Sequence, residues 1–255
     1  MSSPIEVVSL GRFARAVLSS GNARVIAVFE RSCYVEAPAG LACLGVVGNG
    51  PLNAHCASLP PGLAVGHTPA IDFGSAAAWS PRKALAGPAH TSAQSLARLA
   101  TLAARRLPSE GFGYLLDPAR ERPLAVEALA AWLAAPSGAP VGAAGLIGLG
   151  PGLTPSGDDL IGGALCALHA TGRQDVAARL AAWALPLARL GTNRISCAHL
   201  ECASEGECGE AVNDAIVALA SGGEADLDRI DAIGHTSGWD ALAGAVLALA
   251  ALGPD

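Results

Sequence analysis

Acidic and hydroxyl side chains gather in one glycine-rich stretch, residues 148–159, which reads GLGPGLTPSGDD. Asp158 and Asp159 are candidates for proton transfer or for complementing the positive end of a helix. Thr154 and Ser156 add hydroxyl groups next to the glycine backbone. Glycine adopts backbone angles closed to other residues and lets a ligand approach the main chain. The stretch therefore predicts a loop that binds a small molecule.

An apolar segment, residues 160–168, follows this loop and predicts a buried helix that stops near Gly172. Ser156 and Asp159 have the spacing of a capping box, in which each side chain satisfies a backbone amide at the helix start. We therefore expect the loop to lead directly into the N-terminus of a helix. That N-terminus would carry unsatisfied amides and about half a positive charge.

The same pattern occurs a second time near the end of the chain. Residues 156–172 (SGDDLIGGALCALHATG) align without a gap with residues 237–253 (SGWDALAGAVLALAALG). Both copies begin Ser-Gly-x-Asp and have a glycine one turn into the helix, at Gly163 and Gly244. We expect two similar helices that pack closely at these glycines, with both N-termini pointing at one place. Two such N-termini would form an anion site without any lysine.

The two copies differ at one acidic position, where Trp239 replaces Asp158. This difference favours Asp158 as the catalytic residue and gives Asp159 a more structural role. In the alternative interpretation, Asp159 only closes the capping box and Asp158 only complements the helix dipole.

Two further segments contribute candidate site residues. Residues 191–196 (GTNRIS) place two hydroxyls and the guanidinium of Arg194 within about one helical turn, a set suited to gripping a carboxylate or phosphate. Thr192 as a helix N-cap is the alternative there. Residues 234–238 (GHTSG) place His235 just before the second helix, where it is either an acid–base group or a structural histidine. The predicted catalytic residues are Asp158, Asp159 and His235. The predicted substrate-binding residues are Gly150, Gly152, Thr154, Ser156, Gly157, Thr192, Arg194, Ser196, Thr236 and Ser237.

Composition excludes several classes of function. The net charge of −6 argues against nucleic-acid binding. The single lysine, Lys83, lies in a turn-like segment, and the chain has no P-loop motif, so fixed positive charge must come from arginine. Cys197, His199, Cys202 and Cys208 lack paired C-x-x-C spacing, so no metal is predicted, and no cofactor is predicted either. The longest charge-free apolar run, residues 241–252, is too short to span a bilayer. We expect a cytoplasmic protein with reduced thiols.

The chain changes character near residue 90. Before it, short apolar runs at 24–29, 33–37, 41–47 and 62–66 predict strands with antiparallel neighbours. After it, helical periodicity predicts helices at 93–107, 123–134, 174–190, 192–200 and 209–219, with a kink at Pro186. The predicted fold class is α+β: a small antiparallel β-rich domain, residues 1–90, followed by an all-helical domain, residues 91–255, that contains the two Ser-Gly-x-Asp helices.

The motif at residues 148–159 resembles the AllH-type subunit family of oxamate carbamoyltransferase, which acts in anaerobic allantoin breakdown. The resemblance extends to Thr192, to Ile195 and Ser196, to residues 203–210 and to residues 234–238. It implies phosphorolysis of oxalurate to oxamate and carbamoyl phosphate, or the reverse. It also implies other protein subunits, one similar to acyl-CoA synthetases, and allows a homo-oligomer.

These reactants are small anions, which suits paired helix N-termini, hydroxyls and one arginine. From the residues we expect Gly150, Gly152, Ser156 and Ser237 to donate hydrogen bonds. Arg194 would orient a carboxylate, and Asp158 or His235 would carry the proton of the leaving nitrogen. Two alternatives stay open: a non-catalytic assembly or ligand-sensing subunit, and a related activity on another small carboxylic acid.

Overall fold

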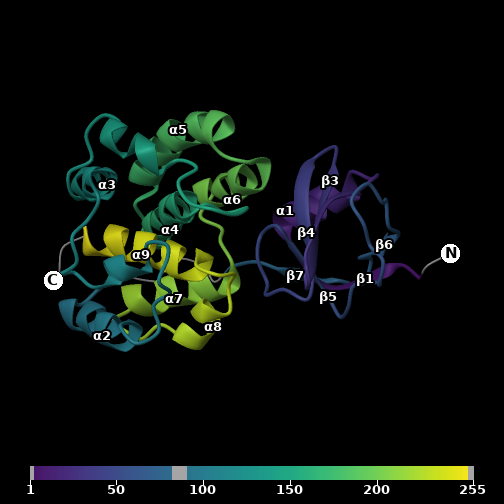
Figure 1. Cartoon of the computed structure of the whole chain (residues 1–255), viewed down its shortest axis with the longest axis horizontal. Helices are drawn as coiled ribbons and strands as arrows, with labels where there is room; N and C mark the ends of the chain where they lie inside the picture. The colour runs from purple at the N-terminus through teal and green to yellow at the C-terminus, as the bar shows by residue number, and fades with distance from the viewer. Residues whose placement is uncertain (1–2, 82–90, 252–255) are drawn as a thin grey trace. The chain divides into compact units, whose positions relative to one another are not determined.

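The computed structural model describes residues 3–81 and 91–251. The chain divides into two compact units, residues 1–81 and 82–255, each with its own hydrophobic core (Figure 1). The predicted domain boundary at residue 90 adjoins a segment outside the described residues, so it stays a prediction. Lys83, and Gly253 at the end of the second repeat, also lie outside the described residues.

The N-terminal unit is a sheet whose strand order is β2-β3-β4-β5-β1-β6, with β7 also pairing with β1. Its strands are β1 (Ile5–Gly11), β2 (Arg24–Val28), β3 (Ser32–Ala37), β4 (Gly40–Gly45), β5 (Asn53–Cys56), β6 (Ile71–Asp72) and β7 (Ala77–Trp79). One helix, α1 (Arg12–Ser19), packs on the sheet through Ala14, Val17 and Leu18.

The α+β fold class is confirmed, and β2, β3 and β4 pair antiparallel as expected. The sheet also contains parallel pairs, β4 with β5 and β1 with β6 and β7. The strand expected at residues 62–66 is wrong, because Gly62 and Gly66 have φ of +78° and +93° and form turns. Neither α1 nor the strands β1, β5, β6 and β7 were predicted from the sequence.

The C-terminal unit is helical. Its α-helices are α2 (Ala93–Ala103), α3 (Leu124–Ala134), α4 (Ser156–Ala170), α5 (Gln174–Gly191), α6 (Arg194–Ser204), α7 (Glu210–Ala220), α8 (Leu227–Asp231) and α9 (Ser237–Ala250). Two 3₁₀ helices, η1 (Gly113–Leu116) and η2 (Val141–Leu146), lie among them. Figure 1 shows α4 and α9 inside this unit, and these two helices make its most extensive contact among the described elements. Within the described ranges, no helix is both long enough and apolar enough to cross a membrane.

The predicted close packing of α4 and α9 is confirmed. A Cβ atom built on Gly163 would lie 1.8 Å from the carbonyl oxygen of Ala241, and one built on Gly244 would lie 1.8 Å from that of Leu160. Leu160 aligns with Ala241 in the repeat, just as Gly163 aligns with Gly244. The two contacts are therefore reciprocal, and each helix approaches the other at its own glycine.

The expected capping box is wrong. α4 begins at Ser156 itself and has Pro155 as its N-cap, with no side-chain hydrogen bond at the cap. The carbonyl oxygen of Pro155 accepts from the amides of Asp158 and Asp159, at 2.9 Å and 3.1 Å. Because Ser156 is the first helical residue rather than the cap, its hydroxyl is not placed to close the box. The expected stop is confirmed: Gly172, with φ of +78°, follows the last residue of α4.

Candidate functional site

The starts of α4 and α9 meet. The hydroxyl oxygens of Thr154, just before α4, and Ser237, the first residue of α9, lie 2.8 Å apart. Asp159 interacts electrostatically with Asp240, and Ser237 and Thr154 hydrogen bond with Asp159. The sequence repeat therefore brings its two polar ends together in space. Binding of an anion between them stays a prediction.

Asp158 is the hub of a buried hydrogen-bond network. It is 2% exposed. Its Oδ1 accepts from the amide of Gly148 at 2.8 Å. Its Oδ2 accepts from the hydroxyls of Thr192 at 2.5 Å and Ser196 at 2.6 Å. Asp158 thus ties the glycine-rich loop and the start of α6 to the first turn of α4.

This network gives Thr192 and Ser196 a partner inside the protein. From the sequence we expected their hydroxyls to bind an anion, whereas in the structure both donate to Asp158. The alternative role of Thr192 as the N-cap of the following helix is wrong, and Thr192 is instead the C-cap of α5. Asn193 caps α6, and its Oδ1 accepts from the amides of Ile195 and Ser196, both at 3.0 Å. Asparagine is well suited to this position because its short side chain reaches the first free amides.

Asp159 and Asp240 form a second acidic group at the same helix starts. The Oδ2 atoms of both residues are buried and, among the described residues, have no hydrogen-bond partner. Burial, together with the nearby charges of Asp240 and Asp158, raises the pKa of Asp159 well above its usual value, although hydrogen bonds from Ser237 and Thr154 oppose the shift. Asp240 is fully buried, and its Oδ1 accepts from the amide of Phe112. Sequence reasoning missed Asp240, although the repeat alignment pairs it with Asp159.

The three loop glycines have different surroundings, although all have positive φ: +69° at Gly148, +119° at Gly150 and +91° at Gly152. A Cβ on Gly148 would lie 2.2 Å from the carbonyl oxygen of Gly191, and one on Gly150 would lie 2.8 Å from the amide nitrogen of Ser156. Gly152 is exposed and has open space around it. The loop therefore packs against the last residue of α5 and the first residue of α4, and Gly152 is its accessible part.

The remaining predicted residues lie at the edges of this region. Gly157 is buried, and its amide donates to the carbonyl of Leu149 at 2.9 Å. Thr236 is the N-cap residue of α9. The side chain of His235 is 82% exposed, with Nε2 4.0 Å from Oε2 of Glu110. Arg194 is the exposed first residue of α6.

The cysteine and histidine groups contribute no metal centre in the parts of the chain that the structure describes. All seven cysteines are free thiols. Burial lowers the pKa of His199 to about 4, so this histidine is neutral at physiological pH. Cys166 hydrogen bonds with Cys208, and its pKa is raised well above the usual value by that contact and by burial. Cys166 is therefore a packing group rather than a nucleophile.

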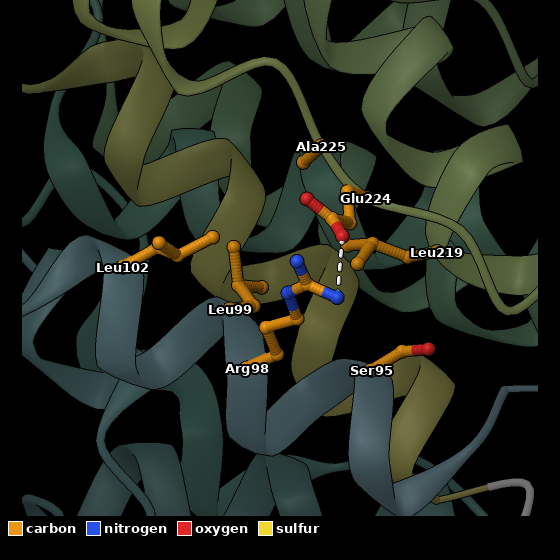
Figure 2. A pocket seen from close by; sticks show the side chains of 7 residues that line it. All are labelled: Ser95, Arg98, Leu99, Leu102, Leu219, Glu224 and Ala225. Atoms are coloured by element: carbon orange, nitrogen blue, oxygen red, sulfur yellow. Dashed lines mark ion pairs between the residues drawn. The ribbon is translucent and has the colours of Figure 1, made fainter.

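A small surface pocket lies between α2 and the end of α7 (Figure 2). Its lining residues are Ser95, Arg98, Leu99, Leu102, Leu219, Glu224 and Ala225. Arg98 and Glu224 form an ion pair of 2.8 Å across it, as Figure 2 shows. Ser95 donates to the carbonyl of Gly222 at 2.9 Å. The polar groups of this pocket are paired, whereas the helix starts hold buried carboxyl oxygens without a hydrogen-bond partner among the described residues, so the pocket is the weaker candidate.

The segment that contains both helix starts also matches a known family. Residues 146–249 fit the model of the family described as oxamate carbamoyltransferase subunit AllH. The chain resembles AllH over this segment. The resemblance inferred from the loop motif is thereby confirmed for residues from the end of η2 to the last turn of α9. The AllH match covers less than half of the chain and does not include the β-rich unit. Comparisons with curated proteins and with solved structures found no match.

The AllH description names a subunit of a carbamoyltransferase, and so a protein that assembles with other subunits. Within the matched segment, the structure brings together Thr154, Ser237 and Asp159, and next to them Asp158 with Thr192 and Ser196. These two polar groups are the candidate functional site.

Proposed function

We propose that this chain is the reactant-binding subunit of an oxamate carbamoyltransferase, with its site at the joined starts of α4 and α9. The reaction is phosphorolysis of oxalurate to oxamate and carbamoyl phosphate, or its reverse. One observation carries the proposal: the hydroxyls of Thr154 and Ser237 lie 2.8 Å apart inside the segment that matches AllH. Every reactant is a small anion, and helix starts with hydroxyls suit such ligands.

The hydrogen-bond donors of the site come from both helices and from the loop. Gly152 lies at the accessible part of the loop, with open space beside it. Gly150 packs over the start of α4, and the hydroxyls of Ser156 and Ser237 mark the first residues of the two helices. In this proposal these groups bind the phosphate and the carbonyl oxygen, while Arg194 orients the carboxylate of oxalurate.

In the phosphorolysis direction, a phosphate oxygen attacks the carbamoyl carbon and the bond from that carbon to the oxamate nitrogen breaks. Negative charge develops on the carbonyl oxygen, and preorganised donors stabilise it. The leaving nitrogen takes up one proton. Both oxygens of Asp158 already accept hydrogen bonds, so we assign Asp158 to holding the loop in place. We assign the proton to Asp159, with His235 as the alternative carrier.

Charge balance supports this choice of residue. Three carboxyl groups, those of Asp158, Asp159 and Asp240, lie at the helix starts and would repel an incoming anion if all were ionised. The raised pKa of Asp159 favours its neutral form, in which one of these negative charges is absent. A neutral Asp159 is also the form that can give a proton to a leaving nitrogen.

A second function is favoured by a different observation. Leu124, Val141 and Leu190 expose 84%, 75% and 90% of their surfaces on the helical unit. Exposed apolar side chains mark a contact surface when they form one contiguous patch. The chain would then serve the complex by assembly or ligand sensing, and another subunit would carry out the chemistry.

Calorimetric titration of the isolated chain with carbamoyl phosphate and with oxamate tests the proposal. Ser237→Ala removes one hydroxyl from the site. A hydrogen bond to a charged group contributes about 1.5 to 3 kcal/mol, so the affinity should fall about 10-fold to 150-fold. Ser221→Ala is the matched control, because the Ser221 hydroxyl contacts only the carbonyl of Val217 in its own helix among the described contacts.

The result separates the two functions. Binding of carbamoyl phosphate that is weakened by Ser237→Ala and unchanged by Ser221→Ala supports the proposal. Absence of binding to the isolated chain, with full activity of Ser237→Ala in the combined complex, would contradict it and favour the assembly function.

A further inference from the structure

Asp240 is the repeat counterpart of Asp159, and the structure holds it in a specific way. Its carboxylate lies against the turn before η1, where a Cβ built on Gly111 would be 2.5 Å from Oδ1 and 2.9 Å from Oδ2. Gly111 has φ of +78°, which favours glycine at this position. Oδ1 accepts from the amide of the next residue, Phe112. Asp240 is therefore fixed between α9 and this turn, with no exposed surface.

The two acids have unsatisfied oxygens in the same buried region. Oδ2 of Asp240 and Oδ2 of Asp159 both lack a hydrogen-bond partner among the described residues. Two neighbouring carboxylates in a buried place do not both ionise without compensating positive charge. One proton shared by the pair would remove one charge and give an unpartnered oxygen a hydrogen-bond donor. No group larger than a proton is required to compensate the charge of the pair.

The contacts indicate which acid is neutral. The amide of Phe112 donates to Asp240, and hydrogen bonding to a carboxylate favours its ionised form. We propose that Asp240 is a positioning residue for Asp159: the two carboxyl groups share one proton, and Asp240, fixed by the amide of Phe112, keeps that proton on Asp159. The sharing of the proton stands on the buried, unpartnered oxygens of the two acids and on the hydrogen bond from Phe112, and only the use of that proton in catalysis rests on the proposed function.

The surroundings of the pair are acidic and polar. Among the described residues, the charged groups that act on Asp159 are Asp240 on α9 and Asp158 on α4, and the hydroxyls of Ser237 and Thr154 complete the set. Further out, Glu110 and His235 are exposed and 4.0 Å apart, on the turn before η1 and the turn before α9. Cys197 on α6 interacts with Asp158. The negative charges of Asp240 and Asp158 therefore favour the neutral form of Asp159.

This arrangement gives Asp240 a function in the proposed reaction. Asp159 donates its proton to the leaving oxamate nitrogen and becomes a carboxylate next to the carboxylate of Asp240. Repulsion between the two favours uptake of a proton from solvent, which restores the neutral acid for the next turnover. Asp240 does not contact the reactants and acts only through Asp159.

Infrared spectroscopy of the unliganded full chain, with isotopically labelled aspartate, tests the pair directly. At about pH 7 the wild-type chain should show the carbonyl stretch of one protonated, buried aspartic acid. Asp240→Asn should lose it, because the asparagine keeps an acceptor for Phe112 and offers an N–H to Asp159, which then ionises. Asp159→Asn should also lose it. Glu224→Gln, which changes an exposed carboxylate in the Arg98 ion pair, should keep it.

A wild-type chain without this band, or an Asp240→Asn chain that keeps it, would overturn the inference. Circular dichroism shows whether each variant is folded. If Asp240→Asn does not fold, the wild-type and Asp159→Asn chains decide, because loss of the band in Asp159→Asn supports the pair and its persistence contradicts it. No ligand is used, so failure of carbamoyl phosphate to bind would refute the proposed function and leave the pair intact.

Discussion

Replacement of Asp159 by asparagine should stabilise the folded chain at neutral pH. The substitution keeps the size of the side chain and supplies an amide that can donate to the unpartnered Oδ2 of Asp240, without the proton that Asp159 must take up to do the same. Without that proton the buried oxygens stay unsatisfied, which costs about 1 to 3 kcal/mol, so we expect a gain of about that size. Most substitutions destabilise a protein, so a gain at a buried position is a specific outcome.

The gain should depend on pH in a defined direction. The pKa of Asp159 is raised in the folded chain above its value in the unfolded chain, so folding takes up a proton there. The contribution of that proton to stability is fully present below the unfolded pKa, near 4, and is lost as the pH rises through the folded pKa. Asparagine has no such proton. The advantage of the variant should therefore be smallest near pH 4 and should grow toward neutral pH.

Urea unfolding followed by tryptophan fluorescence at several pH values measures this difference. The buried Trp239, on the same helix as Asp240, reports on the helical unit. Glu224→Gln serves as the control, and as an exposed substitution it should change stability by less than about 0.5 kcal/mol. A variant that is less stable than the wild type at neutral pH, or a stability difference that does not change with pH, would refute this account of Asp159.

Other substitutions test the packing and the hydrogen-bond network. Gly163→Ala should destabilise the chain by about 1 to 3 kcal/mol in urea unfolding, because its Cβ would lie 1.8 Å from the Ala241 carbonyl. Gly162→Ala, whose Cβ would be 3.7 Å from that of Ala203, should instead be neutral or stabilising by up to about 1 kcal/mol. Equal effects of the two substitutions on stability would contradict the close crossing of α4 and α9 at Gly163. Asp158→Ala leaves three donors without their acceptor and should cost about 2 to 5 kcal/mol in thermal or urea unfolding. A cost below about 0.5 kcal/mol would show that the network is not structural.

The sequence predicted most of the helical unit because its signals are local. Apolar periodicity located α2, α3, α5 and α7. Ser92 caps α2, and its hydroxyl accepts from the amide of Ser95. The repeat predicted the α4 and α9 crossing, since a glycine at the same place in two aligned helices has a steric reason that is visible in the sequence. α2 ends at Ala103 rather than at 107, and no glycine marks that end.

The rest depends on contacts between distant residues. The hydroxyls of Thr192 and Ser196 donate hydrogen bonds to Asp158, which is more than thirty positions away, and no local pattern reveals such a partner. The parallel pairing of β4 with β5 is likewise set by the sheet rather than by either strand. Asp240 could have been found, because the alignment that identified Ser237 also pairs Asp240 with Asp159. The hydrogen bond from the amide of Phe112 to Asp240 could not have been found from the alignment.

The central claim is that the starts of α4 and α9 form a single binding site, and a double-mutant cycle on carbamoyl phosphate affinity tests it most directly. The cycle uses Thr154→Val, Ser237→Ala and the double variant, each titrated calorimetrically. Because the two hydroxyls are in contact, we expect a coupling energy of at least about 0.5 kcal/mol, with the double variant losing less than the sum of the single losses. Purely additive losses, or single variants that bind as tightly as the wild type, would contradict the claim.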